Sequence, residues 1–221
     1  MHGEWVTAGY GEEEFSFGWF SLLWGIEARP RVWGMKVAVF FERDGILTNL
    51  VDEGGHFRTA QRMEEFRLRD GVATALSELR RAGFLLFATT NQPGVTAGTP
   101  SRRELELMHT FLSRKLGLDG VLVCPHPLDD SCTCRKPLPG LLKEAAHQYK
   151  LDLEHSFVVS DRWEDAEMAD AVGATSVLVR AKANGNGHHD YIVADFAAAV
   201  AKVIEVAGSQ GTLRVLHEQK H

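Results

Sequence analysis

Cysteine is scarce in this sequence, and the few cysteines present lie close together. The 221-residue chain has three of them, Cys124, Cys132 and Cys134. An odd, clustered set does not suit the disulfide framework of a secreted protein and is more typical of a metal site in a reducing compartment. We therefore expect a cytoplasmic protein whose cysteines bind a metal ion.

Long apolar runs are also lacking. A membrane-spanning helix needs about 18 or more consecutive apolar residues, and no segment of the sequence reaches that length. Residues 15–26, FSFGWFSLLWGI, are apolar and aromatic, but three glutamates, residues 12–14, precede them. A signal peptide begins with a positively charged region instead. The sequence thus predicts neither a membrane span nor a secretory signal.

Positive charge is not in excess. The chain has 24 Lys and Arg against 30 Asp and Glu, which gives a net charge of −6. Nucleic-acid-binding domains carry a basic stripe or patch, and none stands out here, including around the cysteines. The chain is 44% hydrophobic and 24% charged. This composition is ordinary for a globular protein and allows one large α/β domain.

The pattern divides the chain into three parts. A strand begins just after Met35 and Lys36, so we expect the domain to cover residues 35–206. Residues 207–221 are predicted to be a C-terminal tail. Residues 1–34 are an N-terminal extension whose role stays open: it could pack on the domain, or contact a second copy or a membrane surface. The oligomeric state is not determined by the sequence.

Strands alternate with helices along the domain. Short apolar runs predict strands at residues 37–41, 84–90, 120–124, 156–160, 175–179 and 191–193. Helical spacing of apolar residues, with Gly83 at one helix end, predicts helices at residues 72–82, 101–116, 139–149, 163–172 and 195–206. This order predicts a Rossmann-like parallel sheet flanked by helices. Residues 48–63 are expected to be a polar loop, and the interval from Gly45 to Leu85 is too short for a large cap domain.

Polar clusters follow four of the predicted strands, at residues 42–44, 90–92, 124–136 and 161–165. Because parallel strands end at the same edge of a sheet, these clusters should form one site. Its four carboxylates, which would repel one another without a cation, suit Mg²⁺: Glu42, Asp44, Asp161 and Asp165. With Thr90 and Lys136, this set is suited to a phosphate group, which a carboxylate attacks in line.

The cysteine-rich loop supplies four soft metal ligands, Cys124, His126, Cys132 and Cys134. Three thiolates and one imidazole match a closed, tetrahedral zinc site. A closed site leaves no coordination position for a substrate, so the zinc is expected to be structural. It would pin the loop over the site and thereby place Arg135 and Lys136.

Four motifs in this chain resemble those of the haloacid dehalogenase (HAD) superfamily of phosphatases. They are Glu42-Arg43-Asp44-Gly45, the strand-terminal Thr90, Lys136, and the Ser160-Asp161 to Asp165 segment. Within that superfamily, T-N-Q-P-G at 90–94 and the C-x-H…C-x-C-R-K-P loop look like those of the heptose 1,7-bisphosphate phosphatases. The histidinol-phosphate phosphatases are near relatives with a similar zinc loop.

The resemblance implies a role for each matching residue. Glu42 would be the nucleophile and a Mg²⁺ ligand, and Asp44 the general acid and base that also offers its backbone carbonyl to the metal. Asp161 would complete the Mg²⁺ site. The transferring phosphate would be held by Thr90, Asn91 and Lys136. Arg135 would contact the phosphate or sugar of the substrate, and Asp165 would orient Lys136.

Glu42 departs from the family pattern, which has Asp at the nucleophile position. The extra methylene moves the carboxylate roughly an ångström, and a misplacement of that size can slow a reaction on the order of a hundredfold. Ser160 in place of Gly is a smaller change. Two hypotheses follow: a working phosphatase acting on a small phosphorylated metabolite such as heptose 1,7-bisphosphate or histidinol phosphate, or a pseudo-phosphatase that binds such a metabolite without turnover.

Overall fold

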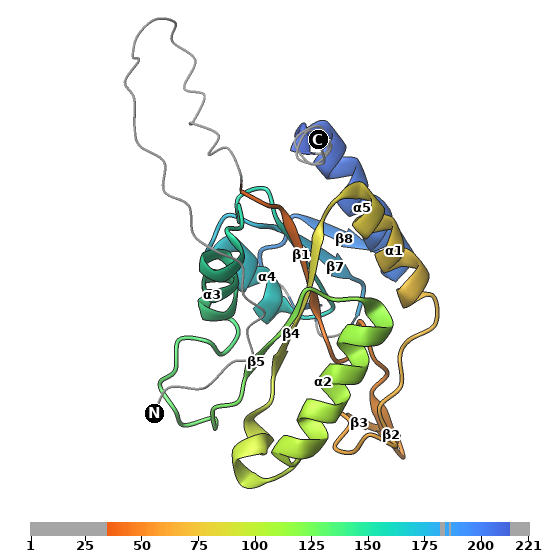
Figure 1. The fold of residues 1–221 in the computed structure, drawn as a ribbon, viewed down its shortest axis with the longest axis vertical. Helices are drawn as coiled ribbons and strands as arrows, with labels where there is room; N and C mark the ends of the chain where they lie inside the picture. Colours follow the sequence, from red (N-terminus) through yellow and green to blue (C-terminus); the bar gives the residue numbers. More distant parts are fainter. Residues whose placement is uncertain (1–34, 182–183, 186, 213–221) are drawn as a thin grey trace, which may run out of the picture. The chain divides into compact units, whose positions relative to one another are not determined.

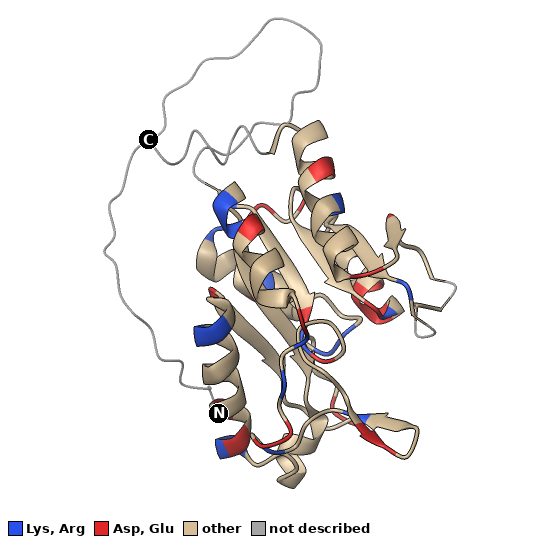
Figure 2. Cartoon of the chain, turned by 90° about the vertical axis from the view of Figure 1, so that its right-hand side faces the viewer, with Lys and Arg blue, Asp and Glu red and all other residues tan. Residues whose placement is uncertain are grey.

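The computed structural model describes residues 35–181, 184–185 and 187–212. The predicted N-terminal extension and most of the predicted tail lie outside these residues. Within them, no helix is long and apolar enough to cross a membrane. Figure 2 shows the Lys and Arg positions interspersed with Asp and Glu positions over the helices of the domain.

A six-stranded parallel sheet forms the centre of the domain (Figure 1). Its strands are β1 (Ala38–Glu42), β4 (Leu85–Asn91), β5 (Gly120–Cys124), β6 (Phe157–Ser160), β7 (Thr175–Val179) and β8 (Tyr191–Val193). They are arranged in the order β5-β4-β1-β6-β7-β8, and every neighbouring pair is parallel. The predicted Rossmann-like α/β fold is confirmed.

Helices cover both faces of the sheet. They are α1 (Val72–Ala82), α2 (Arg102–Leu116), α3 (Gly140–Tyr149), α4 (Trp163–Asp170) and α5 (Phe196–Ser209). Buried residues of α1, α2 and α5 form one apolar core with the sheet, and those of α3 and α4 form a second core on the opposite face. The sheet therefore lies between two layers of helices (Figure 1).

The central strand β1 shows why its sequence is apolar without alternation. Val39 and Phe41 point into the first core, whereas Ala38 and Phe40 point into the second. All four side chains are completely buried. Burying a large apolar side chain stabilises the fold by about 1.5–3 kcal/mol, so both faces of β1 contribute. The apolar run stops at Glu42, where the strand reaches the edge of the sheet.

Two short elements lie where the sequence predicted loops. The hairpin formed by β2 (Val51–Glu53) and β3 (His56–Arg58) occupies part of the predicted polar loop, and a 3₁₀ helix, η1 (Pro93–Ala97), follows β4. The hairpin turns at Gly54 and Gly55, which both have positive φ. Its strands are mostly exposed, so they lack the apolar pattern by which strands are predicted. At the other end of the domain, α5 runs to Ser209, so the predicted boundary at residue 206 falls inside this helix.

Candidate active site

The carboxyl ends of four neighbouring strands bring the predicted polar clusters to one edge of the sheet. Glu42 ends β1, Asn91 ends β4, Cys124 ends β5 and Ser160 ends β6. The register places Glu42 beside Thr89, and Asn91 beside Cys124. Ligands bind at this edge in open parallel sheets, on either side of the point where the strand order reverses. Here that point is β1, whose neighbours are β4 and β6.

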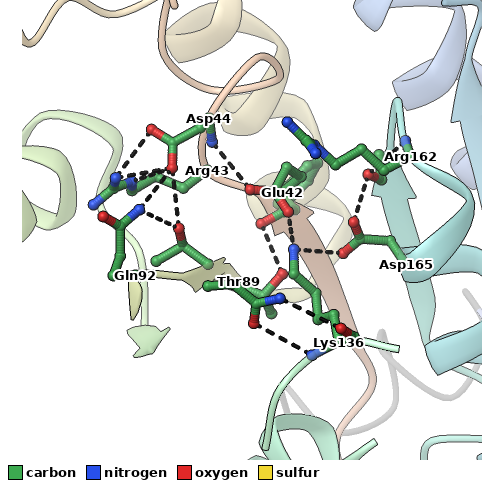
Figure 3. Close-up of polar contacts among 12 residues, drawn as sticks. Glu42, Arg43, Asp44, Thr89, Gln92, Lys136, Arg162 and Asp165 are labelled. Atoms are coloured by element: carbon green, nitrogen blue, oxygen red, sulfur yellow. Dashed lines mark hydrogen bonds and ion pairs between the residues drawn. The ribbon is translucent and has the colours of Figure 1, made fainter. Parts of the chain in front are cut away.

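Lys136 lies between two carboxylates at this edge (Figure 3). Its ammonium group donates to Asp165 Oδ1 at 2.8 Å and also contacts the Glu42 carboxylate. The hydroxyl of Ser160 donates to the other oxygen of Asp165 at 2.9 Å. Burial lowers the pKa of Lys136, and the charge of Asp165 opposes that effect. Asp165 therefore contacts the lysine directly and favours its charged form.

The carboxylate of Asp44 accepts hydrogen bonds from three side chains. Arg43 donates to both of its oxygens at 3.0 Å, Thr90 Oγ1 donates at 3.0 Å and Gln92 Nε2 donates at 3.1 Å. Gln92 also donates to the Thr90 hydroxyl at 2.9 Å. The backbone N–H of Asp44 donates to Glu42 Oε1 at 3.3 Å. Thr90, predicted to hold phosphate, is thus a hydrogen-bond partner of Asp44 in this structure.

Asn91 and Arg135 hold the backbone around Lys136. Lys136 N donates to Asn91 Oδ1 at 3.3 Å, and Asn91 Nδ2 donates to Lys136 O at 3.4 Å. The Arg135 guanidinium donates to the backbone carbonyls of His126 and Pro127. Its buried Nε has no hydrogen-bond partner within the described part of the chain. Arg135 thereby ties together the two ends of the cysteine-rich loop that leads to Lys136.

A cavity of about 480 Å³ opens beside these groups. The predicted site residues that line it are Glu42, Asp44, Asn91, Arg135, Lys136 and Asp165. Arg162 lines it too, and its side chain extends toward Glu42 (Figure 3). Thr90 and Asp161 are not among the lining residues. Carboxylates and cationic side chains both line the cavity, which has room for a small phosphorylated molecule.

The four predicted soft ligands come together in the loop after β5. Their ligand atoms, from Cys124, His126, Cys132 and Cys134, all lie within 4.8 Å of one another. The Cys124 Sγ to Cys132 Sγ distance is 3.7 Å and the Cys124 Sγ to His126 Nδ1 distance is 3.6 Å. A tetrahedron with metal–sulfur bonds of about 2.3 Å has sulfur–sulfur edges of roughly 3.8 Å. The cluster therefore fits a closed tetrahedral metal site.

Comparisons with known proteins agree with this geometry. Residues 133–203 match the HAD-hydrolase-like family model. The D-glycero-beta-D-manno-heptose-1,7-bisphosphate 7-phosphatase of Yersinia pestis is 37% identical over 156 residues, which span 65% of this chain and 80% of the relative. The enzyme of that name from Escherichia coli K12 is 35% identical over 65% of this chain and 78% of its own length.

A solved structure gives the same result. The D,D-heptose 1.7-bisphosphate phosphatase of B. bronchiseptica, complexed with magnesium and phosphate, superimposes with a TM-score of 0.66 at 28% identity. The match covers 78% of this chain and all of that chain. This chain belongs to the HAD-like hydrolase family. Among the members of the family, it is one of the phosphatases.

Asp161, directly after β6, has a carboxylate oxygen that would suit a magnesium ion. Asp161 Oδ1 is buried and has no hydrogen-bond partner among the residues that the structure describes. Burial raises the pKa of Asp161, and a bound cation would offset that cost. A Cβ atom on Gly45 would lie 3.1 Å from Asp161 Oδ2, so glycine at this position avoids a close contact with the carboxylate.

The carboxylates predicted to bind Mg²⁺ lie further apart than the ligand atoms of the Cys/His cluster. Among the described residues, the carboxylates of Glu42, Asp44 and Asp161 do not form a group within 4.8 Å, as the Cys/His ligands do. The roles assigned to these residues stay predictions.

Sequence reasoning missed several residues that shape the site. Gln92 was quoted within a motif but given no role, and Arg43, Arg162 and Asn184 were not singled out. Asn184 is buried and donates to the backbone carbonyls of Asp161 at 3.0 Å and Val179 at 2.9 Å. His109, on α2, accepts from Arg43 at 2.9 Å. Its only sequence signal was its spacing of four residues from Leu105, on the apolar face of α2.

Proposed function

We propose that this HAD-like phosphatase hydrolyses a phosphomonoester of a small sugar phosphate such as heptose 1,7-bisphosphate, with Mg²⁺ as cofactor. The observation that carries the proposal is the contact between Glu42, at the end of β1, and the buried Lys136 that Asp165 orients beside the cavity. The substrate class is supported by the relatives, which are named for heptose bisphosphate.

In the proposed reaction, the Glu42 carboxylate attacks the phosphorus atom and the bond to the sugar oxygen breaks. Asp44 donates a proton to that oxygen, and an acyl phosphate forms on Glu42. A water molecule then attacks the phosphorus while Asp44 takes its proton, so phosphate leaves, Glu42 is again a carboxylate and Asp44 is again protonated. Lys136 offsets the negative charge of the phosphoryl group throughout.

Glu42, the backbone carbonyl of Asp44, and Asp161 would hold Mg²⁺, which neutralises phosphate oxygens as a Lewis acid when bound. Asn91 keeps Lys136 in place through its backbone, and Arg135, which lines the cavity, would contact a substrate anion. Thr90 contributes to the phosphate site in this proposal while it also donates to Asp44.

We propose zinc as the ion of the Cys/His cluster. The donor set of three sulfurs and one nitrogen suits zinc, and the closed arrangement leaves no open position. Its role would be to fix the loop that leads from Cys124 to Arg135 and Lys136 at the rim of the cavity.

A second candidate function follows from Glu42 itself. Its carboxylate contacts the Lys136 ammonium, and this pairing would have to open or shift before Glu42 could reach a phosphorus atom. A protein in which the pair stays closed would bind a phosphorylated metabolite through Lys136 and Arg135 without cleaving it. The same experiment separates the two functions.

The experiment measures phosphate release with Mg²⁺ from heptose 1,7-bisphosphate and from histidinol phosphate. It compares the native protein with Glu42→Asp, which restores the shorter carboxylate, and with Glu42→Gln, which has no nucleophilic oxygen anion. Turnover by the native protein that is lost in Glu42→Gln supports the proposal, and the better substrate defines the class. Turnover by Glu42→Asp alone favours the non-catalytic binder. Activity that persists in Glu42→Gln would exclude Glu42 as the nucleophile.

A further inference from the structure

Arg43, between the two carboxylates of the first motif, is completely buried. Placing a charged guanidinium in a protein interior is unfavourable unless its charge is paired and its N–H groups find acceptors. Arg43 meets the first condition through Asp44, to which Nε and Nη2 both donate at 3.0 Å. The ring of Phe66 lies against the guanidinium, with its centroid 5.6 Å from Cζ.

The second condition is met by a residue of another element. Arg43 Nη1 lies 2.9 Å from His109 Nε2 on α2. A guanidinium has only donors, so His109 Nε2 is the acceptor and the ring is neutral. Burial and the positive charge of Arg43 lower the pKa of His109 to about 3, so the ring stays an acceptor at any pH at which such an enzyme works.

The planar guanidinium couples the two contacts. Its N–H groups point in fixed directions, so the plane that satisfies His109 on one side also determines where Nε and Nη2 face Asp44. His109 is carried by a helix whose neighbouring residues Leu105, Met108 and Leu112 are buried in the core. The position of α2 therefore affects the orientation of the Asp44 carboxylate, because His109 on α2 holds the Arg43 side chain that donates to it.

We propose that His109 is a positioning residue: by holding Arg43, it keeps the Asp44 carboxylate oriented for proton transfer to the leaving oxygen. This inference rests on the proposed function, in which Asp44 is the proton donor. The side chains of Thr90 and Gln92 contact only Oδ2 of Asp44, so Arg43 is the described partner that contacts both carboxylate oxygens.

The test compares His109→Leu, which removes the acceptor, with His109→Gln, whose amide oxygen can accept from Arg43. The substrates are heptose 1,7-bisphosphate, whose sugar oxygen needs a proton to leave, and p-nitrophenyl phosphate, whose nitrophenolate leaves without one. The measured quantity is kcat/KM, which covers the steps up to departure of the leaving group. We expect His109→Leu to lower kcat/KM about tenfold or more for the sugar phosphate and less than about twofold for p-nitrophenyl phosphate. His109→Gln should restore most of the loss.

The matched control is His147→Leu, at an exposed position of α3, which should change neither value. Equal losses for both substrates in His109→Leu, or no loss for either, would overturn the inference, because a structural role alone does not discriminate leaving groups.

A crystal structure of His109→Leu decides the question independently of activity. Displacement of Arg43 from Asp44 supports the inference, and a retained bidentate pair overturns it. If the native protein cleaves neither substrate, the proposed function fails and the crystal structure alone decides about His109.

Discussion

Lys136 donates a hydrogen bond of 2.8 Å to the carboxylate of Asp165, and both side chains are buried. Lys136 belongs to the loop before α3, whereas Asp165 lies in the first turn of α4. The pair therefore joins the loop of the Cys/His cluster to the first turn of α4. Burial lowers the pKa of Lys136, and the charge and hydrogen bond of Asp165 oppose that effect.

Asp165→Asn should thus lower both stability and activity. Removing one partner of a buried ion pair costs about 3–5 kcal/mol, and the remaining contact of Lys136 with Glu42 places the expected loss at about 3 kcal/mol. Phosphatase activity should fall at least about tenfold, because Lys136 loses its orientation. Denaturant unfolding and kinetics measure the two effects. Asp170→Asn, at an exposed position of the same helix, is the control and should match the native protein.

Gly45→Ala tests the close approach of Gly45 to Asp161. Gly45 has a φ of 94°, and its added Cβ would lie 3.1 Å from Asp161 Oδ2. We expect the positive φ to cost about 1–2 kcal/mol of unfolding free energy and the displaced carboxylate to raise the Mg²⁺ concentration needed for activity. The control is Gly71→Ala: its φ is 78°, but no described atom lies within 4 Å of the added Cβ. A similar effect of both variants on Mg²⁺ dependence would contradict the prediction.

Metal removal tests the Cys/His cluster. We expect the purified protein to contain one equivalent of zinc, measured by elemental analysis, and a zinc-selective chelator to lower its melting temperature. A loss of about 3 kcal/mol would correspond to a shift of roughly 6–12 °C in a domain of this size. Cys134→Ser should reproduce the effect, and Ser131→Ala, in the same loop, should not. Unchanged melting temperature and substrate affinity after zinc removal would show that the ion has no structural role.

His109 gives the stability a specific pH dependence. Its pKa is lowered from 6.5 to about 3 in the folded protein, so between these values the unfolded chain binds the extra proton. The contribution of His109 to the free energy of unfolding is fully present above pH 6.5. It is lost as the pH falls toward 3, at about 1.4 kcal/mol per pH unit. Urea unfolding of the native protein and His109→Gln between pH 7 and about 4.5 measures it. The native protein should lose stability more steeply, and His147→Leu should keep the native slope.

The sequence predicted most of the fold because the central strands β1, β4 and β6 are buried on both faces. The run from Val37 to Phe41 is apolar without interruption, and helices such as α2 carry apolar residues at helical spacing. The hairpin β2–β3 was missed because its side chains are largely exposed, so no pattern of burial marks it. The end of α5 was placed too early, since Val206 and Ala207 still pack in the core.

In the site too, some features follow from the sequence and others do not. The positions of Glu42, Asn91, Cys124 and Asp161 at strand ends follow from chain order, because parallel strands end at one edge of the sheet. The partners of these residues do not follow from chain order. Thr90 donates to Asp44, which adjoins Arg43, and Arg43 in turn binds a histidine that lies 66 residues further along the chain.

What the sequence by itself determined is therefore the order of the elements, the edge at which the polar residues gather and the four residues that form the Cys/His cluster. Spacing and burial periodicity carry that information locally. Only the tertiary structure decided which donor meets which acceptor: that Lys136 contacts Glu42 as well as Asp165, and that His109 is the partner of Arg43. A difference of a few tenths of an ångström in the distance between two side chains decides whether they form a hydrogen bond. For side chains from different elements, tertiary packing sets that distance.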